Sequence, residues 1–235
     1  MSATPSALDA ATATMISLIG SLADNKSALG RRYGEWAVSA PTIESAVAAA
    51  AMAQDELGHA RSTYPVLAKL GVERSDEGLD VGRPMHVIER QLSDWPAVIA
   101  ANLVVDGILT TFVAGARQSS IEPLAQRARK ILQEEGAHRV HAEAWLRRIS
   151  RAGSDGAELL HARVLEMWSE ASRWPGPPDD AGYLAAVEQG MVSEGPVTVR
   201  DRVREWLSER LAAEGASIML EDPSDWSSWD PESRR

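Results

Sequence analysis

Two short segments of the chain repeat one arrangement of an acid and a histidine. They read QDELGH at residues 54–59 and QEEGAH at residues 133–138. In each, the glutamate and the histidine are three residues apart, so on a helix they lie one turn apart on one face and can bind one metal ion together. This spacing alone is weak evidence for a metal site, because Glu158 and His161 have the same spacing. We expect no site at that third pair, which lacks a mid-helix position in the bundle.

A two-metal site in a four-helix bundle also needs one acid from each of the other two helices. Asp106 is the only charged residue between Val98 and Ala114, and a buried carboxylate is costly unless a cation or a metal ion compensates it. The alternative is that Asp106 faces solvent on an amphipathic helix. Glu35 is the candidate from the first helical stretch, and Asp24 is a weaker substitute on the same face.

These residues together predict one two-metal centre. The predicted metal ligands, which would also be catalytic through the metals, are Glu35, Glu56, His59, Asp106, Glu135 and His138. The chain has no cysteine, so carboxylates and imidazoles must supply every ligand. Four carboxylates and two imidazoles suit two divalent first-row ions, with two iron ions as our first choice and manganese as the alternative.

Four long helical stretches can position these side chains. Apolar residues recur at helical spacing over residues 6–38, 42–70, 93–117 and 120–149. Glu56 lies 14 residues after the expected cap at Thr42, Glu135 15 after Ser120, and Asp106 13 after Ser93. At 1.5 Å per residue these positions agree in depth within about 3 Å. The three side chains are therefore expected at the middle of one bundle.

The connections between the stretches are short, long and short. About twenty residues separate the second stretch from the third, enough to cross the length of the bundle, with a short helix expected near residues 87–92. This order predicts an all-α, ferritin-like four-helix bundle with a long crossover between helices 2 and 3. We expect the bundle to occupy residues 1–153. Residues 154–235 would add C-terminal helices packed on the same domain and a loosely ordered polar tail at 222–235.

Composition limits the partners. The formal net charge of −10 argues against a nucleic-acid partner, because such proteins gather Lys and Arg against phosphates. The N-terminus lacks the pattern of a signal peptide, and no later window has about eighteen apolar residues without charge. We therefore expect a cytoplasmic protein with no membrane partner.

The motifs resemble a known family. Over roughly residues 20–175 the chain resembles the ferritin-like subunits of the phenylacetyl-CoA epoxidase (ring 1,2-monooxygenase) system, through LADN (22–25), LGRR (29–32), EW (35–36), AP (40–41), QDELGH (54–59), Asp106 and EGAH (135–138). That family has a catalytic di-iron subunit and a similar subunit that has lost a working site and serves as a scaffold. The resemblance therefore implies one of these two roles for this chain. The first helix resembles the scaffold subunit, whereas the metal positions resemble the catalytic subunit and imply the same six ligands.

Three functions follow as hypotheses. The leading one is a di-iron, O2-activating monooxygenase or epoxidase acting on an aromatic or acyl-CoA thioester. Its electrons would come from a separate reductase, because the chain shows no flavin fingerprint and has no cysteine for an iron–sulfur cluster. The second is a non-catalytic scaffold subunit of such a complex. The third is a ferritin-like metal oxidase without an organic substrate. The first two imply a homo- or hetero-oligomer.

Overall fold

The computed structural model describes residues 7–73 and 82–235, and these residues form helices and no strands. The long helices are α1 (Ala7–Trp36), α2 (Ile43–Leu67) and α6 (Glu122–Ala152), together with a rod made of α4 (Trp95–Ala100), the π-helical segment η3 (Ala101–Asp106) and α5 (Gly107–Gly115). The shorter ones are η1 (Ala68–Leu70), α3 (His86–Glu89), α7 (Ser154–Ala171), α8 (Ala181–Glu188) and α9 (Pro196–Ala213). The predicted all-α, ferritin-like fold is confirmed.

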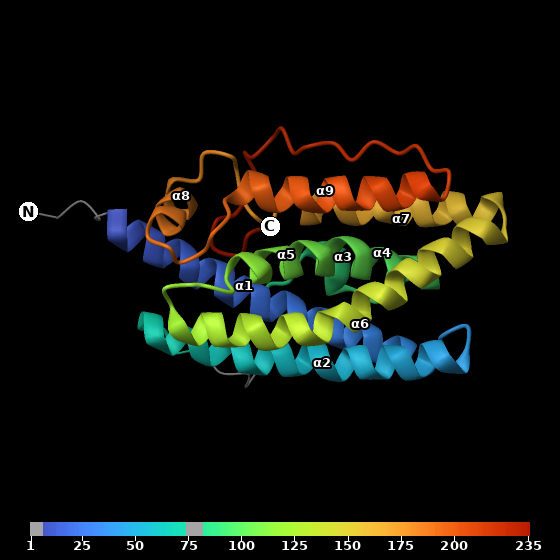
Figure 1. Cartoon of the computed structure of the whole chain (residues 1–235), viewed down its shortest axis with the longest axis horizontal. Helices are drawn as coiled ribbons and strands as arrows, with labels where there is room; N and C mark the ends of the chain where they lie inside the picture. The colour runs from blue at the N-terminus through green and yellow to red at the C-terminus, as the bar shows by residue number, and fades with distance from the viewer. Residues whose placement is uncertain (1–6, 74–81) are drawn as a thin grey trace, which may run out of the picture.

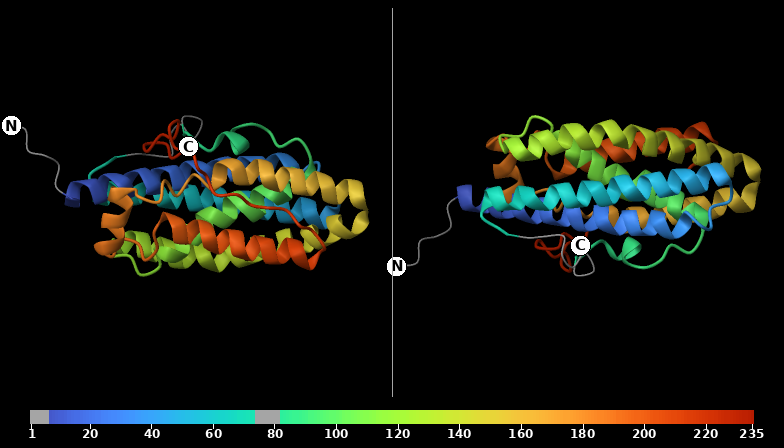
Figure 2. Two further views of the ribbon diagram at one scale, coloured as in Figure 1. Left: turned by 90° about the horizontal axis from the view of Figure 1, so that it is seen from above. Right: turned by 90° about the horizontal axis from the view of Figure 1, so that it is seen from below.

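Helix α1 and helix α2 form an antiparallel pair, and α6 runs alongside α2 (Figures 1 and 2). The rod α4–η3–α5 lies against α6, so that four long elements surround one core. Every residue from Ala97 to Asp106 is buried. By length and composition alone, the rod could cross a membrane. Its apolar side chains are instead accounted for by the core, because 78% of its most apolar window is buried inside the protein.

The helix starts follow from local chemistry. The Thr42 hydroxyl accepts a hydrogen bond from the Ser45 backbone N–H at 3.2 Å, and the Asp94 carboxylate accepts one from Ala97 at 2.8 Å. Such caps satisfy backbone donors that have no partner within the helix. They fix where α2 and α4 begin, and hence the depth of the side chains that follow.

The long connection between the second and third long elements includes the short helix α3. The Glu170 carboxylate accepts hydrogen bonds from the backbone N–H groups of His86 and Val87 at 2.6 and 2.9 Å, which holds α3 against α7. Part of the predicted crossover, residues 74–81, lies outside the described residues.

The C-terminal helices form a second layer. Helices α7 and α9 run over the rod α4–α5 on the side away from α2 (Figure 1). The division of the chain at residue 153 stays a prediction. The expectation of a loosely ordered tail does not hold for its last residues, because Ser233 and Arg234 are 6% and 1% exposed. The sequence indicated a polar segment but not the buried arginine that anchors it.

Candidate metal centre and its internal cation

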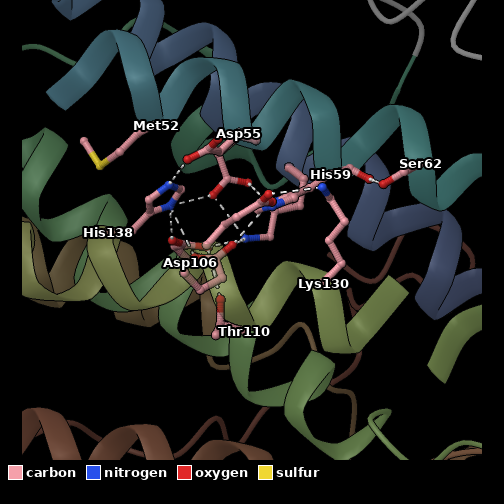
Figure 3. Close-up of polar contacts among 12 residues, drawn as sticks. Met52, Asp55, His59, Ser62, Asp106, Thr110, Lys130 and His138 are labelled. Carbon is pink, nitrogen blue, oxygen red and sulfur yellow. Dashed lines mark hydrogen bonds and ion pairs between the residues drawn. The ribbon is translucent and has the colours of Figure 1, made fainter. Parts of the chain in front are cut away.

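Five of the six predicted ligands meet inside the bundle. Helix α2 contributes Glu56 and His59, η3 contributes Asp106, and α6 contributes Glu135 and His138. All five residues are at most 4% exposed. Figure 3 shows Asp106 and the two imidazoles directed toward one another from these helices. The solvent-facing alternative for Asp106 is therefore excluded.

The first helix supplies a lysine at this position. The Lys26 ammonium nitrogen lies 2.5 Å from Asp106 Oδ1, 2.5 Å from Glu135 Oε1 and 3.1 Å from Glu56 Oε1. The Lys26 side chain is 0% exposed. Below, the inner cluster means Lys26 together with Glu56, Asp106 and Glu135. A buried ammonium group is tolerated only with partners of this kind.

Glu35 is not part of the inner cluster. Its carboxylate pairs with Arg32 at 2.9 Å and its side chain is 33% exposed. The expectation that Glu35 joins the other five residues is wrong, because it lies one residue before the end of α1 while Glu56 lies 13 residues into α2. In an antiparallel pair this separates their depths by roughly 18 Å.

The weaker substitute, Asp24, also lies elsewhere. It is buried but accepts hydrogen bonds from the Tyr64 hydroxyl at 2.7 Å and from the Arg83 backbone N–H at 3.1 Å. The third acid–histidine pair, Glu158 and His161, lies on α7 outside the inner cluster. Among the described residues, neither member of that pair lies with the buried acids and histidines that could bind a metal ion.

Two outer carboxylates hold the imidazoles. His138 Nε2 lies 3.2 Å from Asp55 Oδ2, and His59 Nε2 lies 2.7 Å from Glu134 Oε2. The arrangement is reciprocal, because each outer acid precedes the inner glutamate of one helix and contacts the histidine of the other. Figure 3 shows the contact between Asp55 and His138. Such contacts fix the orientation of both rings and point each Nδ1 inward.

The inward nitrogen atoms face the inner carboxylates. His138 Nδ1 lies 3.3 Å from both Glu56 and Glu135, and His59 Nδ1 lies 3.3 Å from Glu135. Neither Nδ1 atom has a well-aligned hydrogen-bond partner, nor has Glu56 Oε2. Buried polar atoms without such partners are uncommon and suit atoms able to bind an ion.

Electrostatics favour the charged forms of Lys26 and of both histidines. Burial alone would lower the pKa of each histidine, but the surrounding carboxylates raise the pKa of His59 to about 9 and that of His138 to about 12. Burial likewise opposes the charge on Lys26, yet Asp106, Glu135 and Glu56 hold its pKa well above the usual value. At neutral pH three cations therefore face three inner carboxylates.

The inner carboxylates differ in the direction of their pKa shifts. Burial and the neighbouring acids Glu135 and Glu56 raise the pKa of Asp106 to about 6. Burial would also raise the pKa of Glu135, but Lys26 and the two imidazoles hold it well below its usual range. Burial opposes the charge on Glu56 as well, but Lys26 and the two imidazoles lower its pKa below the usual value. The three inner carboxylates are therefore mainly ionised at pH 7 and balance the three cations without an added ion.

The π-helical segment positions Asp106. A π-turn contains more residues than an α-turn and often occurs at functional sites. All six residues of η3 are buried, and Asp106 ends the segment, where Thr110 donates a hydrogen bond to Oδ1 at 3.4 Å. Its place in η3 thus brings the only acid of the rod to the inner cluster.

A pocket of about 590 Å³ reaches the cluster from one side. Asp106 and Glu135 lie on its wall, and residues of α5, α6 and α9 complete it, including Thr110, Leu132 and Trp206. The Arg139 guanidinium stacks on the Trp206 ring 4.1 Å from its centroid, at the α6–α9 side. The inner carboxylates are buried but border a space open to solvent.

Four residues could hold a metal ion. Ligand atoms of Glu56, Asp106, Glu135 and His138 lie within 4.8 Å of one another. These residues do not complete a six-ligand set for two ions, however, because α1 contributes the Lys26 ammonium group to the cluster and no carboxylate. An ion bound by the inner oxygens would compete for the space that Lys26 Nζ occupies.

Comparison with known proteins agrees with this architecture. The whole chain, residues 1–235, matches the family described as phenylacetic acid catabolic protein. Over 153 residues it is 24% identical to the C subunit of the 1,2-phenylacetyl-CoA epoxidase of Escherichia coli (strain K12). That alignment covers 63% of this chain and 62% of the relative, so it spans less than two thirds of either protein. The chain belongs to the phenylacetic acid catabolic protein family.

Proposed function

We propose that this chain is a non-catalytic, metal-free structural subunit of a multi-subunit oxygenase of the phenylacetyl-CoA epoxidase type. The observation that carries the proposal is Lys26, whose ammonium group lies among the three inner carboxylates at 2.5–3.1 Å. The similarity to one subunit of such an epoxidase supports membership of the complex. In this role the inner cluster stabilises the bundle, and a homologous subunit performs the oxygenation of the CoA thioester.

The main competing function is a di-iron monooxygenase or epoxidase using this chain's own ligands. Five assembled ligands and three buried polar atoms without well-aligned hydrogen-bond partners favour it. It would require Lys26 to leave a fully buried position, and Glu35 does not replace it. A ferritin-like iron or manganese oxidase without an organic substrate has the same requirement. The internal cation therefore disfavours both functions.

Within the proposed complex, this chain requires partners. The oxygenase needs a catalytic subunit, a CoA thioester substrate and a source of electrons. This chain has no cysteine for an iron–sulfur cluster, so a separate reductase supplies the electrons. We place the complex in the cytoplasm. The net charge of −10 argues against a nucleic-acid partner.

The test is reconstitution with the homologous catalytic subunit and its reductase, with phenylacetyl-CoA as substrate. We expect no oxygenated product from this chain alone, and product from the complex at an undiminished rate when this chain carries His138→Gln. The variant must first show the helical circular dichroism of the parent. If this chain were the catalyst, His138→Gln would lower the rate by orders of magnitude, and turnover by the chain alone with the reductase would contradict the proposal outright.

A further inference from the structure

The inner cluster has the parts of a metal centre except for one side chain. We infer that it is a latent two-metal site that Lys26 keeps closed, so that exchange of this lysine for glutamate converts the chain into one that binds divalent ions. The inference rests on the proposed function, in which the native chain holds no metal. It adds that residue 26 alone determines whether the chain binds metal ions.

The imidazoles are already oriented for binding. The Asp55 and Glu134 carboxylates hold the Nε2 atoms of His138 and His59 at 3.2 and 2.7 Å. Both Nδ1 atoms point inward without a well-aligned partner. Outer carboxylates of this kind fix the ring orientation of ligating histidines. No rearrangement of α2 or α6 is needed to present one imidazole from each helix.

The oxygen ligands are also in place. Glu56, Asp106 and Glu135 each direct one oxygen to Lys26 Nζ, at distances of 2.5–3.1 Å. Three carboxylates and two imidazoles lack only one acid of the set that two-metal bundles use, and metal binding would release the protons that the imidazoles carry. Position 26 is where the missing acid belongs, because its side chain is the one from α1 that reaches the other three.

The substitution fits in length and in charge. A glutamate side chain is one atom shorter than lysine, so its carboxylate would stop short of the Nζ position and leave room there for ions. Four carboxylates would then match the charge of two divalent ions. The pocket of about 590 Å³ that borders Asp106 and Glu135 offers ions a route from solvent.

The experiment compares metal binding by the native chain, Lys26→Glu, Lys26→Gln and Lys69→Glu. Lys69 is exposed in η1, directly after the end of α2, so Lys69→Glu makes the same charge change away from the cluster. Each protein is incubated anaerobically with Fe2+ or with Mn2+, freed of unbound metal by gel filtration, and analysed for metal per chain. Thermal unfolding is measured with Mn2+ and again after a chelator.

We expect about two ions per Lys26→Glu chain, fewer for Lys26→Gln, and far less than one for the native chain and Lys69→Glu. Mn2+ should raise the melting temperature of Lys26→Glu only, and the chelator should reverse the rise. Adding His138→Ala to Lys26→Glu should remove most of the binding. If Lys26→Glu folds only when refolded with metal, that dependence supports the inference equally.

Two outcomes are distinct. An empty native chain with metal binding by neither Lys26→Glu nor Lys26→Gln would overturn the latent site while leaving the structural role intact. Two ions in the native chain would instead overturn the proposed function, because Lys26 would then fail to keep the site closed.

Discussion

The Lys26 side chain is fully buried, and its ammonium group contacts three carboxylates. Replacing it by methionine keeps the volume but removes the cation that these carboxylates share. Removing one partner of a buried ionic group costs about 3–5 kcal/mol, so we expect Lys26→Met to lower the free energy of unfolding by that amount in urea. Lys130→Ala is the control, since Lys130 is 63% exposed and its pair with Glu134 contributes less than about 1 kcal/mol.

His59 gives a pH dependence with a definite sign. Its pKa is about 9 in the folded protein, against 6.5 for an unperturbed histidine. Its charged form therefore stabilises the fold fully below pH 6.5, progressively less as the pH rises, and not at all above about pH 9. The total is roughly 3 kcal/mol. We expect the stability difference between the native chain and His59→Gln to shrink from pH 6.5 to pH 9 in urea unfolding; a constant or growing difference would contradict this.

For single residues, the sequence located five of the six side chains that meet inside the bundle and misassigned the sixth. The acid–histidine spacing and the isolated charge of Asp106 located their residues because both follow from helix periodicity. Residue type alone favours Glu35 on the first helix. Depth along the helix pair favours the region of Lys26 instead, about ten residues before the end of α1.

Close packing of α1 against α2 determines whether Lys26 reaches its partners. A Cβ atom added at Gly30 would lie 2.8 Å from Leu57 Cγ and 3.1 Å from the Ala53 carbonyl oxygen. Gly30→Ala must therefore push the helices apart one turn after Lys26. We expect a loss of about 1–3 kcal/mol in the free energy of unfolding.

Gly58→Ala is the matched control for that change. Nothing lies within 4 Å of a Cβ atom at Gly58, in the middle of α2. Alanine should therefore stabilise the helix there by about 0.5–1 kcal/mol. Thermal or urea unfolding of the two variants measures the contrast, and equal effects would show that helix–helix contact at Gly30 does not limit the packing.

Element boundaries were predictable where local chemistry sets them. Thr42 and Asp94 cap helices near where the sequence placed the starts, and the predicted end of the fourth stretch falls within a few residues of Gly153. The π-helical segment was not predictable, because its apolar residues fit the α-helical period equally well.

Across the whole molecule, the C-terminal residues connect the two layers. The Arg234 guanidinium donates to the carbonyl oxygens of Trp174 and Pro175 at 3.0 and 2.6 Å, and pairs with Asp180 at 3.2 Å. The Ser21 hydroxyl of α1 donates to the Ser233 carbonyl oxygen at 3.1 Å. The tail therefore ties α1 to the loop after α7.

Arg234→Ala should loosen this connection. It leaves buried carbonyl oxygens and Asp180 without a donor, so we expect a loss of at least about 2 kcal/mol in the free energy of unfolding. Glu232→Ala is the control, because the Glu232 side chain is 85% exposed and should change stability by less than about 0.5 kcal/mol. An Arg234→Ala variant as stable as the control would mean that the tail contributes little to the fold.

The most direct test of the internal cation is diffraction from crystals of the native chain grown anaerobically with Mn2+ or Fe2+. We expect continuous electron density for the Lys26 side chain between Glu56, Asp106 and Glu135, and no anomalous peak among the three carboxylates. Two anomalous peaks about 3.5–4 Å apart, with Lys26 turned away from the carboxylates, would contradict the proposed metal-free subunit.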